Sequence, residues 1–280
     1  MIAAAICLCI LLILLEELYQ WVHAERLQGS AWVIEPAAGA SARDRILRHM
    51  RYTRFMRSAE LLLLGFVWTL AGAAVSGRVF DSQYGQLASL LLLLQLLRLL
   101  GRSVIRRWTI WINMEILEVG FLVALLLRGH PSGEIVTASP ETGWAWAPGL
   151  SSVFAAAGLA VASCFAITYL MRRAVPTRSH FFEELPSMAL SLEWMARMAA
   201  ISLPFAILTP LLVLARPGAE LLAALPFVLA ALLDLFVVLE TRQVRNPHRL
   251  GPACAGAVLG FLLLVMAIGW GQQLFAHSAL

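Results

Sequence analysis

Lysine is absent from this chain of 280 residues, and charged residues of any kind are few. All 21 basic residues are arginine, and charged residues make up only 14% of the chain. Soluble globular domains carry about 25% charged residues. The shortage of charge, a hydrophobic fraction of 60% and a mean hydropathy of +0.80 together exclude an ordinary soluble protein.

Cysteine and recognisable catalytic motifs are also scarce. The four cysteines, Cys7, Cys9, Cys164 and Cys254, lie in apolar stretches and show no Cys-x-x-Cys spacing. We therefore expect inert, buried thiols and no disulfide or metal site. No phosphate-binding glycine loop, dinucleotide-binding pattern, zincin motif or nucleophile elbow occurs. The sequence points to no catalytic chemistry of its own, so whether the chain is an enzyme stays open.

Long apolar stretches are what the sequence does contain. Spanning a hydrocarbon core of about 30 Å requires roughly 20 helical residues. The candidate spans are residues 1–22, 59–77, 85–101, 109–128, 149–171, 195–215, 219–240 and 253–275. We predict an all-α integral membrane protein with about eight transmembrane helices, and a single polytopic membrane domain over residues 1–280.

The arginines predict the orientation of these spans. Sixteen of them lie in the connections that follow the first, third, fifth and seventh stretches. Arginine-rich connections stay in the cytoplasm. This pattern predicts a multi-pass protein of a bacterial-type cytoplasmic (inner) membrane with both termini outside. The net charge of +4 then reflects contact with anionic lipids of the inner leaflet, and no nucleic-acid partner is expected.

The two halves of the chain, residues 1–140 and 141–280, resemble each other weakly. Phe66 falls opposite Phe205, and the residues from Gly101 to Arg106 are similar to those from Thr241 to Arg245. Two copies of four spans each would be parallel four-helix bundles related by an axis along the membrane normal. The other interpretation is chance similarity between leucine-rich segments.

Residues 39–57 form a basic segment in which apolar side chains alternate with arginines. The arginines are Arg43, Arg45, Arg48, Arg51 and Arg54. Their spacing predicts an amphipathic helix at the cytoplasmic surface. Such a helix binds anionic lipid headgroups, and it could equally dock an acidic partner subunit. The two interpretations are compatible.

Four ionisable residues inside the spans are the best functional candidates, because each costs several kcal/mol in lipid unless it is paired or hydrated. They are Glu115, Glu118, Asp234 and Arg98. Glu115 and Glu118 share one helical face through their i, i+3 spacing. We treat the four as candidates for a quinone site or a proton path. The structural alternative is that Arg98 pairs with Glu115 or Asp234 and only aligns the helices.

Haem is not expected as a cofactor. Its axial ligation would require histidines inside the spans. The six histidines, His23, His49, His130, His180, His248 and His277, fall in predicted loops or at predicted helix ends. No cofactor is expected to be bound covalently, whereas quinone remains a candidate.

One connection resembles a known family. Leu100-Gly101-Arg102-Ser103, followed by Arg106 and then Glu115, resembles the Leu-Gly-Arg-Pro loop of the haem-free, eight-span anchor subunits of the dimethyl-sulfoxide-reductase and polysulfide-reductase type. Ser103 replaces the proline of that motif, and the loop here follows the third span on the inner side. The resemblance implies a pair of four-helix bundles that exchange electrons between quinone and iron–sulfur subunits.

Two functional hypotheses follow. The first is an integral membrane subunit of a larger energy-transducing, respiratory-type complex, which anchors other membrane or peripheral subunits and lines a quinone site without haem. The alternative is a stand-alone ion or small-solute transporter or channel that uses Glu118, Glu115 and Asp234.

Overall fold

The computed structural model describes the backbone of residues 2–31, 40–74, 79–80, 82–104, 108–128, 146–174, 186–215, 221–243 and 250–278. Side chains are described for residues 2–16, 18–19, 52, 55–73, 79–80, 82–101, 113–127, 146–174, 186–215, 221–243 and 250–269.

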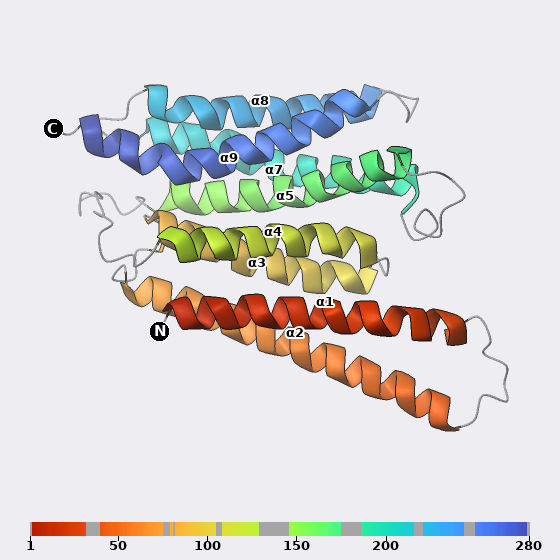
Figure 1. Ribbon diagram of the computed structural model, residues 1–280. Coiled ribbons are helices and arrows are strands. Elements are labelled where there is room, and N and C mark those ends of the chain that lie inside the picture. The colour runs from red at the N-terminus through yellow and green to blue at the C-terminus, as the bar shows by residue number, and fades with distance from the viewer. Residues whose placement is uncertain are drawn as a thin grey trace. The chain divides into compact units, whose positions relative to one another are not determined.

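The described chain is helical throughout its regular structure, which confirms the all-α prediction. Its eight helices are α1 (Ile2–Ala31), α2 (Ala40–Ala74), α3 (Gln83–Val104), α4 (Trp108–Arg128), α5 (Ala147–Ala174), α7 (Met188–Leu214), α8 (Leu221–Gln243) and α9 (Gly251–Ser278). Figure 1 labels each of these helices and colours them in chain order, from red to blue. Within the described residues, these helices leave only short connecting pieces.

Among the residues whose side chains are described, six helical segments are long and apolar enough to cross a membrane. They are Phe55–Ala73, Gln83–Gly101, Ala147–Ala174, Met188–Leu214, Leu221–Gln243 and Gly251–Gly269. The described part of α1 contributes a shorter apolar segment, Ile2–Glu16. The structure is therefore that of a helical protein suited to a membrane, while the count of eight spans and the internal repeat stay predictions.

The first two helices are longer than the predicted spans. The span predicted over residues 1–22 is part of α1, which continues to Ala31, and the span over 59–77 is part of α2, which begins at Ala40. His23 and His49, which we expected in loops or at helix ends, therefore lie within helices. Hydropathy detects only the apolar part of a helix, whereas hydrogen bonding along the backbone continues into polar sequence.

The chain divides into two compact units, Met1–Leu70 and Ala71–Leu280. In the first unit, α1 and α2 are joined by an ion pair in which Arg57 Nε lies 2.9 Å from Glu16 Oε1. The rings of Tyr19 and Tyr52, near this pair in sequence, contact each other at an interplanar angle of 41°, with centroids 4.3 Å apart. These contacts connect the two helices through side chains that are polar or aromatic.

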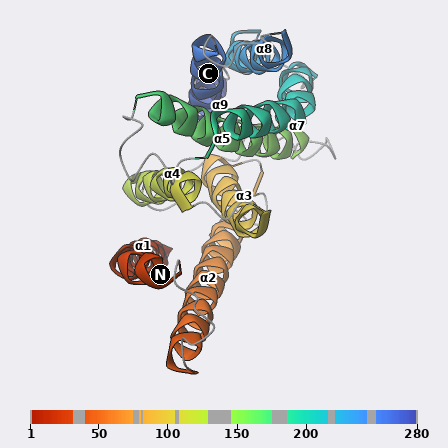
Figure 2. The same cartoon turned by 90° about the vertical axis from the view of Figure 1, so that its right-hand side faces the viewer.

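The second unit contains a four-helix bundle. Helix α5 packs against α7, α7 against α8, α8 against α9, and α9 against α5, so the four helices form a closed ring (Figure 1, Figure 2). Helices α3 and α4 pack against each other and against α5. Consequently α5 lies between the α3–α4 pair and α8 in both views.

Small residues allow α5 to occupy this central position. Half of residues 155–166 are alanine, with Gly158 and Ser163 also among them, and most of α5 is buried. A Cβ on Gly158 would lie 2.6 Å from the Cβ of Ser202 on α7, closer than real Cβ atoms approach one another. Membrane helices associate through such small residues, because lipid leaves no hydrophobic force between helices.

The side chains of helix α8 are distributed in the opposite way to those of a helix in a soluble protein. Leu225, Leu229 and Leu232 are exposed, whereas Ala230 and Asp234 are buried. A soluble protein rarely exposes an apolar surface of this extent. The large apolar side chains of α8 therefore suit contact with lipid, and its small and polar side chains face the bundle.

The turn at residues 79–80 contacts both the start of α3 and the start of α5. Gln86 donates a hydrogen bond of 2.6 Å from Nε2 to the carbonyl oxygen of Phe80, and Gly85 N–H donates to Ser82 Oγ at 2.9 Å. A Cβ on Gly149 would lie 1.9 Å from the Phe80 oxygen, so only glycine fits there. This contact fixes the position of α3 along the axis of α5, and with it the position of Arg98.

Candidate functional site

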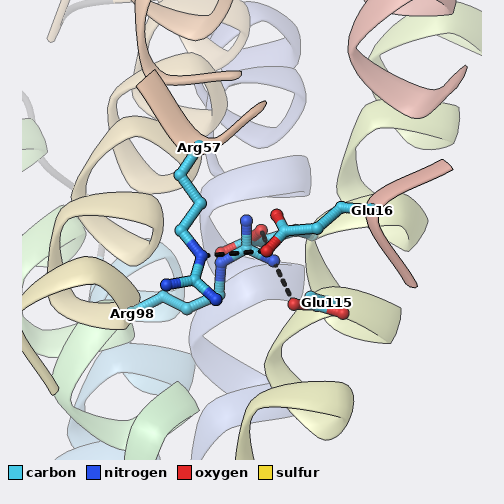
Figure 3. A network of polar contacts seen from close by, with 5 residues as sticks. Glu16, Arg57, Arg98 and Glu115 are labelled. Atoms are coloured by element: carbon cyan, nitrogen blue, oxygen red, sulfur yellow. Dashed lines mark hydrogen bonds and ion pairs between the residues drawn. The ribbon is translucent and has the colours of Figure 1, made fainter. Parts of the chain in front are cut away.

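The central polar feature of the second unit joins Arg98 of α3 to the two glutamates of α4. Arg98 Nη1 lies 2.6 Å from Glu115 Oε1 and 3.5 Å from Glu118 Oε2. Figure 3 shows the contact between Arg98 and Glu115. The side chains of Arg98 and Glu118 are 1% and 0% exposed. We call these three residues the α3–α4 cluster.

Consecutive helices and helical periodicity explain why these residues meet. Helices α3 and α4 follow one another along the chain and pack together. Glu115 and Glu118 lie on one face of α4 through their i, i+3 spacing, and that face is turned to α3. Of the two pairings considered from the sequence, the structure therefore has Arg98 with Glu115.

Charge and burial together determine what the α3–α4 cluster can do. Ionised groups away from water are costly unless their charge is compensated at close range. Here two carboxyl groups share one guanidinium. A change in the charge of either carboxyl is felt strongly by the other, because few water molecules screen their interaction. Such an arrangement can bind and release a proton, or it can serve only to align two helices.

A different face of α4 forms hydrogen bonds to α5 through uncharged groups. Asn113 donates from Nδ2 to Thr168 Oγ1 at 3.0 Å, and Thr168 donates to the carbonyl oxygen of Cys164 at 2.7 Å. Asn113 also lies 3.5 Å from that same carbonyl oxygen. The position of α4, and therefore of Glu115, is set by hydrogen bonds that do not involve the charged groups.

Asp234 does not join the α3–α4 cluster. It lies on α8, is 0% exposed, and its Oδ2 accepts a hydrogen bond of 2.6 Å from Ser202 Oγ on α7. Helix α5 lies between α4 and α8 (Figure 2). The carboxyl groups that the sequence suggested as one path are thus divided into two sites within the second unit.

The first unit holds its own buried carboxylates. Glu16 and Glu60 are each 1% exposed, and Glu16 pairs with Arg57, as Figure 3 also shows. The predicted lipid or partner contacts have side chains outside the described residues; these are Arg43, Arg45, Arg48, Arg51 and Arg54. Only their backbone is described, as part of α2.

Two buried polar residues of the second unit were not predicted from the sequence. Ser202 is the partner of Asp234, and Gln95, which is 0% exposed, lies one turn before Arg98 on α3. Gln95 could have been found, because it interrupts a run of leucines. A serine in a membrane helix is too common to attract notice, so Ser202 required the structure.

The cysteines are free thiols in the structure. Cys9, Cys164 and Cys254 are buried as predicted, whereas Cys7 is exposed, which corrects the expectation for that residue. Its position on α1 turns it outward, although its neighbours in sequence are apolar. Within the side chains that the structure describes, no three His, Cys, Asp or Glu residues gather as metal ligands would.

Comparisons with protein-family models, with curated proteins and with solved structures gave no match to this chain. The two buried polar sites of the second unit are therefore the features that bear on function.

Proposed function

We propose that this chain is an integral membrane subunit of a larger energy-transducing complex of the respiratory type, and that its α3–α4 cluster exchanges protons with a bound quinone. One observation carries the proposal. Two buried carboxyl groups, Glu115 and Glu118, share the single guanidinium of Arg98 between two apolar helices. The second carboxyl places a further ionisable group beside the same guanidinium, and a buried pair of carboxyl groups suits proton exchange.

Quinone chemistry requires such groups. Reduction of a quinone to a quinol takes up two electrons and two protons, and oxidation returns both. A redox-active partner subunit would supply or accept the electrons. Glu118 and Glu115 would supply or accept the protons, and Arg98 would stabilise negative charge on a quinone oxygen as it develops. No haem is part of this proposal.

The proposed topology has both termini outside a bacterial-type cytoplasmic membrane. Arg172 and Arg173 lie in the last turn of α5, and Arg242 lies in the last turn of α8. A Cβ on Gly251, the first residue of α9, would lie 4.0 Å from Arg173 Nη1. The arginine-bearing end of α5 therefore lies beside the start of α9, the helix that follows the arginine-bearing end of α8, which supports a single basic face on the cytoplasmic side.

Helix α2 supports a role for partner proteins. It comprises 35 residues, about 52 Å at 1.5 Å per residue, which exceeds a hydrocarbon core of about 30 Å. From Ala40 onward, the basic segment continues into the apolar part without a break in the helix. Under this proposal it contacts anionic lipids next to the membrane and an acidic surface of a partner subunit beyond them.

The alternative function, a stand-alone ion or small-solute transporter or channel, is favoured by a different observation. Asp234 provides a third buried carboxyl in the second unit, on the other side of α5. A path would then use Glu118, Glu115 and Asp234 in succession. This hypothesis requires water to connect the two sites, which the complex-subunit hypothesis does not.

Purification in a mild detergent, followed by mass spectrometry of proteins and lipids, separates the two functions. We expect stoichiometric partner subunits and a quinone to remain bound. A monomer or homo-oligomer without quinone, together with ion flux after reconstitution into vesicles, would contradict the subunit proposal and support transport.

The residue that tests the site is Glu118. Glu118→Gln keeps the shape of the side chain and removes its proton exchange, so quinone turnover by the purified complex should fall about 100-fold or more. Glu193→Gln is the matched control, because Glu193 is 52% exposed and pairs with Arg197 on the surface of α7. Unchanged turnover of the Glu118 variant in an intact complex would exclude the α3–α4 cluster from the chemistry.

A further inference from the structure

Asp234 is buried in a bundle of apolar helices, and no charged side chain among the described residues pairs with it. Its Oδ2 lies 2.6 Å from Ser202 Oγ, and its Oδ1 has no hydrogen-bond partner within the described part of the chain. Both residues are 0% exposed. An acid in these surroundings differs from Glu115, which lies beside a guanidinium.

The helices that carry this pair pack closely beside it. Gly158 of α5 approaches Ser202 so tightly that a Cβ would lie 3.2 Å from the Ser202 Cα. On the side of α9, Gly256 and Gly260 lie against Val237 and Leu233 of α8. These glycines bring α5 close to α7 at Ser202, and α9 close to α8 at residues on either side of Asp234 in the sequence.

The hydrogen atoms available to the pair can be counted. Ser202 has one hydroxyl hydrogen, but its Oγ lies within hydrogen-bond distance of two oxygens, Asp234 Oδ2 and the Ala199 carbonyl at 2.9 Å. A serine hydroxyl donates once and can accept as well. If Asp234 carries a proton on Oδ2, it donates to Ser202, and Ser202 donates to Ala199.

With that proton, every hydrogen of the pair has an acceptor, and the only unsatisfied atom is a neutral carbonyl oxygen. Without that proton, Ser202 must lose its hydrogen bond to the Ala199 carbonyl in order to donate to the Asp234 carboxylate. The Oδ1 atom of the carboxylate then still has no described donor. Burying an uncompensated charge costs far more than leaving one neutral acceptor without a donor. The observed contacts therefore match the protonated acid.

We propose that Asp234 and Ser202 form a proton-binding site in the α5–α7–α8–α9 bundle, in which Asp234 carries one exchangeable proton. Release of that proton leaves a charge that requires a further donor. No described residue donates to Oδ1, so release must accompany a separation of α7 from α8 that admits water. The site is independent of the α3–α4 cluster and of any quinone.

The charged and titratable neighbours do not alter this assignment. Helix α8 packs against α7 and α9. The other such side chains described on these three helices are Glu193 and Arg197 on α7, Glu240 and Arg242 on α8, and Cys254 on α9. Glu193 and Arg197 pair with each other at the surface, and Asp234 has no ion-pair or hydrogen-bond partner among the five.

Infrared spectroscopy of the purified protein tests the proposal directly. The spectrum of the wild type minus that of Asp234→Asn, at neutral pH, should contain the carbonyl stretching band of a protonated carboxylic acid. That band should move to lower frequency after incubation in D2O. The difference spectrum of Glu193→Gln, an exposed acid, is the control and should contain carboxylate bands instead.

Two results would overturn the proposal. Carboxylate bands in the Asp234 difference spectrum would show an ionised group, and an acid band unchanged in D2O would show a trapped, purely structural proton. If Asp234→Asn does not fold, Ser202→Ala provides the second variant. Loss of the acceptor at 2.6 Å should move the acid band to higher frequency, and an unmoved band or no acid band would contradict the site.

Discussion

The α3–α4 cluster and the Asp234–Ser202 pair lie in the same unit and are equally buried, but they stabilise a carboxyl group in different ways. Glu115 and Glu118 face the guanidinium of Arg98. Asp234 faces a serine hydroxyl. The first arrangement compensates a charge with a charge, and the second suits a neutral acid that is only hydrogen-bonded.

This difference shows that burial alone does not define the chemistry of an acid in a membrane helix. A carboxylate that has a cationic partner can remain ionised in an apolar environment, whereas an acid without one is more stable when protonated. The two sites therefore differ in the hydrogen-bonding or ion-pairing partner of the carboxyl group, and not in how deeply that group is buried. Substitutions of the partners should separate them, and the expected effects differ in size.

The largest effect is expected from Arg98→Gln. It removes the cation that lies 2.6 Å from Glu115 and should lower the free energy of unfolding by about 3–5 kcal/mol, the cost of breaking a buried ion pair on one side. Denaturant titration of the protein in micelles measures this change. The control is Arg197→Gln, because Arg197 is 58% exposed; removing a surface pair should cost less than about 1 kcal/mol. Equal losses would contradict the role assigned to Arg98.

The next effect is expected at the helix contact beside Asp234. Gly158→Ala places a methyl group 2.6 Å from the Ser202 Cβ, and overpacking of this kind costs about 1–3 kcal/mol. Thermal unfolding in detergent measures it. Gly120→Ala on α4 is the matched change, because a Cβ there meets no atom within 4 Å. It should leave stability unchanged or raise it by up to about 1 kcal/mol, and a destabilisation as large as that at Gly158 would contradict the packing argument.

A smaller loss is expected for Ser202→Ala. The substitution removes the hydrogen bond to Asp234 and should cost about 0.5–1.5 kcal/mol, the usual net value for one hydrogen bond. Ser191→Ala provides the comparison, because Ser191 is buried on the same helix and its Oγ has no hydrogen-bond partner in the described structure. Unfolding curves of the two variants should therefore differ, and coincident curves would show that the Ser202 contact contributes nothing.

The smallest effect is expected for Asp234→Asn. An amide is neutral and can donate to Ser202 as the protonated acid does, so stability should change by less than about 1 kcal/mol. The same exchange at Glu115 removes the charge that faces Arg98 and should cost more, since a buried cation loses its closest partner. Parallel denaturant titrations compare the two. A larger loss at Asp234 than at Glu115 would reverse the distinction between the sites.

The sequence predicted the helices well where a helix and its apolar stretch coincide. The span predicted over residues 109–128 is α4, Trp108–Arg128, and that over 149–171 is contained in α5, Ala147–Ala174. It failed at α1 and α2, which extend beyond their apolar parts. Hydropathy reports the length of the lipid-facing segment, whereas the backbone hydrogen bonds that define a helix are insensitive to polarity.

For the candidate sites, the sequence identified the acids but only one of their partners. Glu115, Glu118 and Asp234 were recognised because charge is costly in an apolar stretch, and Arg98 was considered as a partner for Glu115 or Asp234. Arg98 and Glu115 lie on consecutive helices, so their pairing could be anticipated. Ser202 was not, because the register between α7 and α8 cannot be read from either helix alone.

The sequence by itself indicated a membrane environment for this protein, because its shortage of charge and its long apolar stretches suit lipid rather than water. It also indicated three acids that are buried, Glu115, Glu118 and Asp234, because each lies well inside an apolar stretch. Only the tertiary structure decided that Arg98 joins the glutamates of α4 while Asp234 joins Ser202. The reason is that helix contacts depend on shape, and small residues such as Gly158 set how closely each pair of helices can approach.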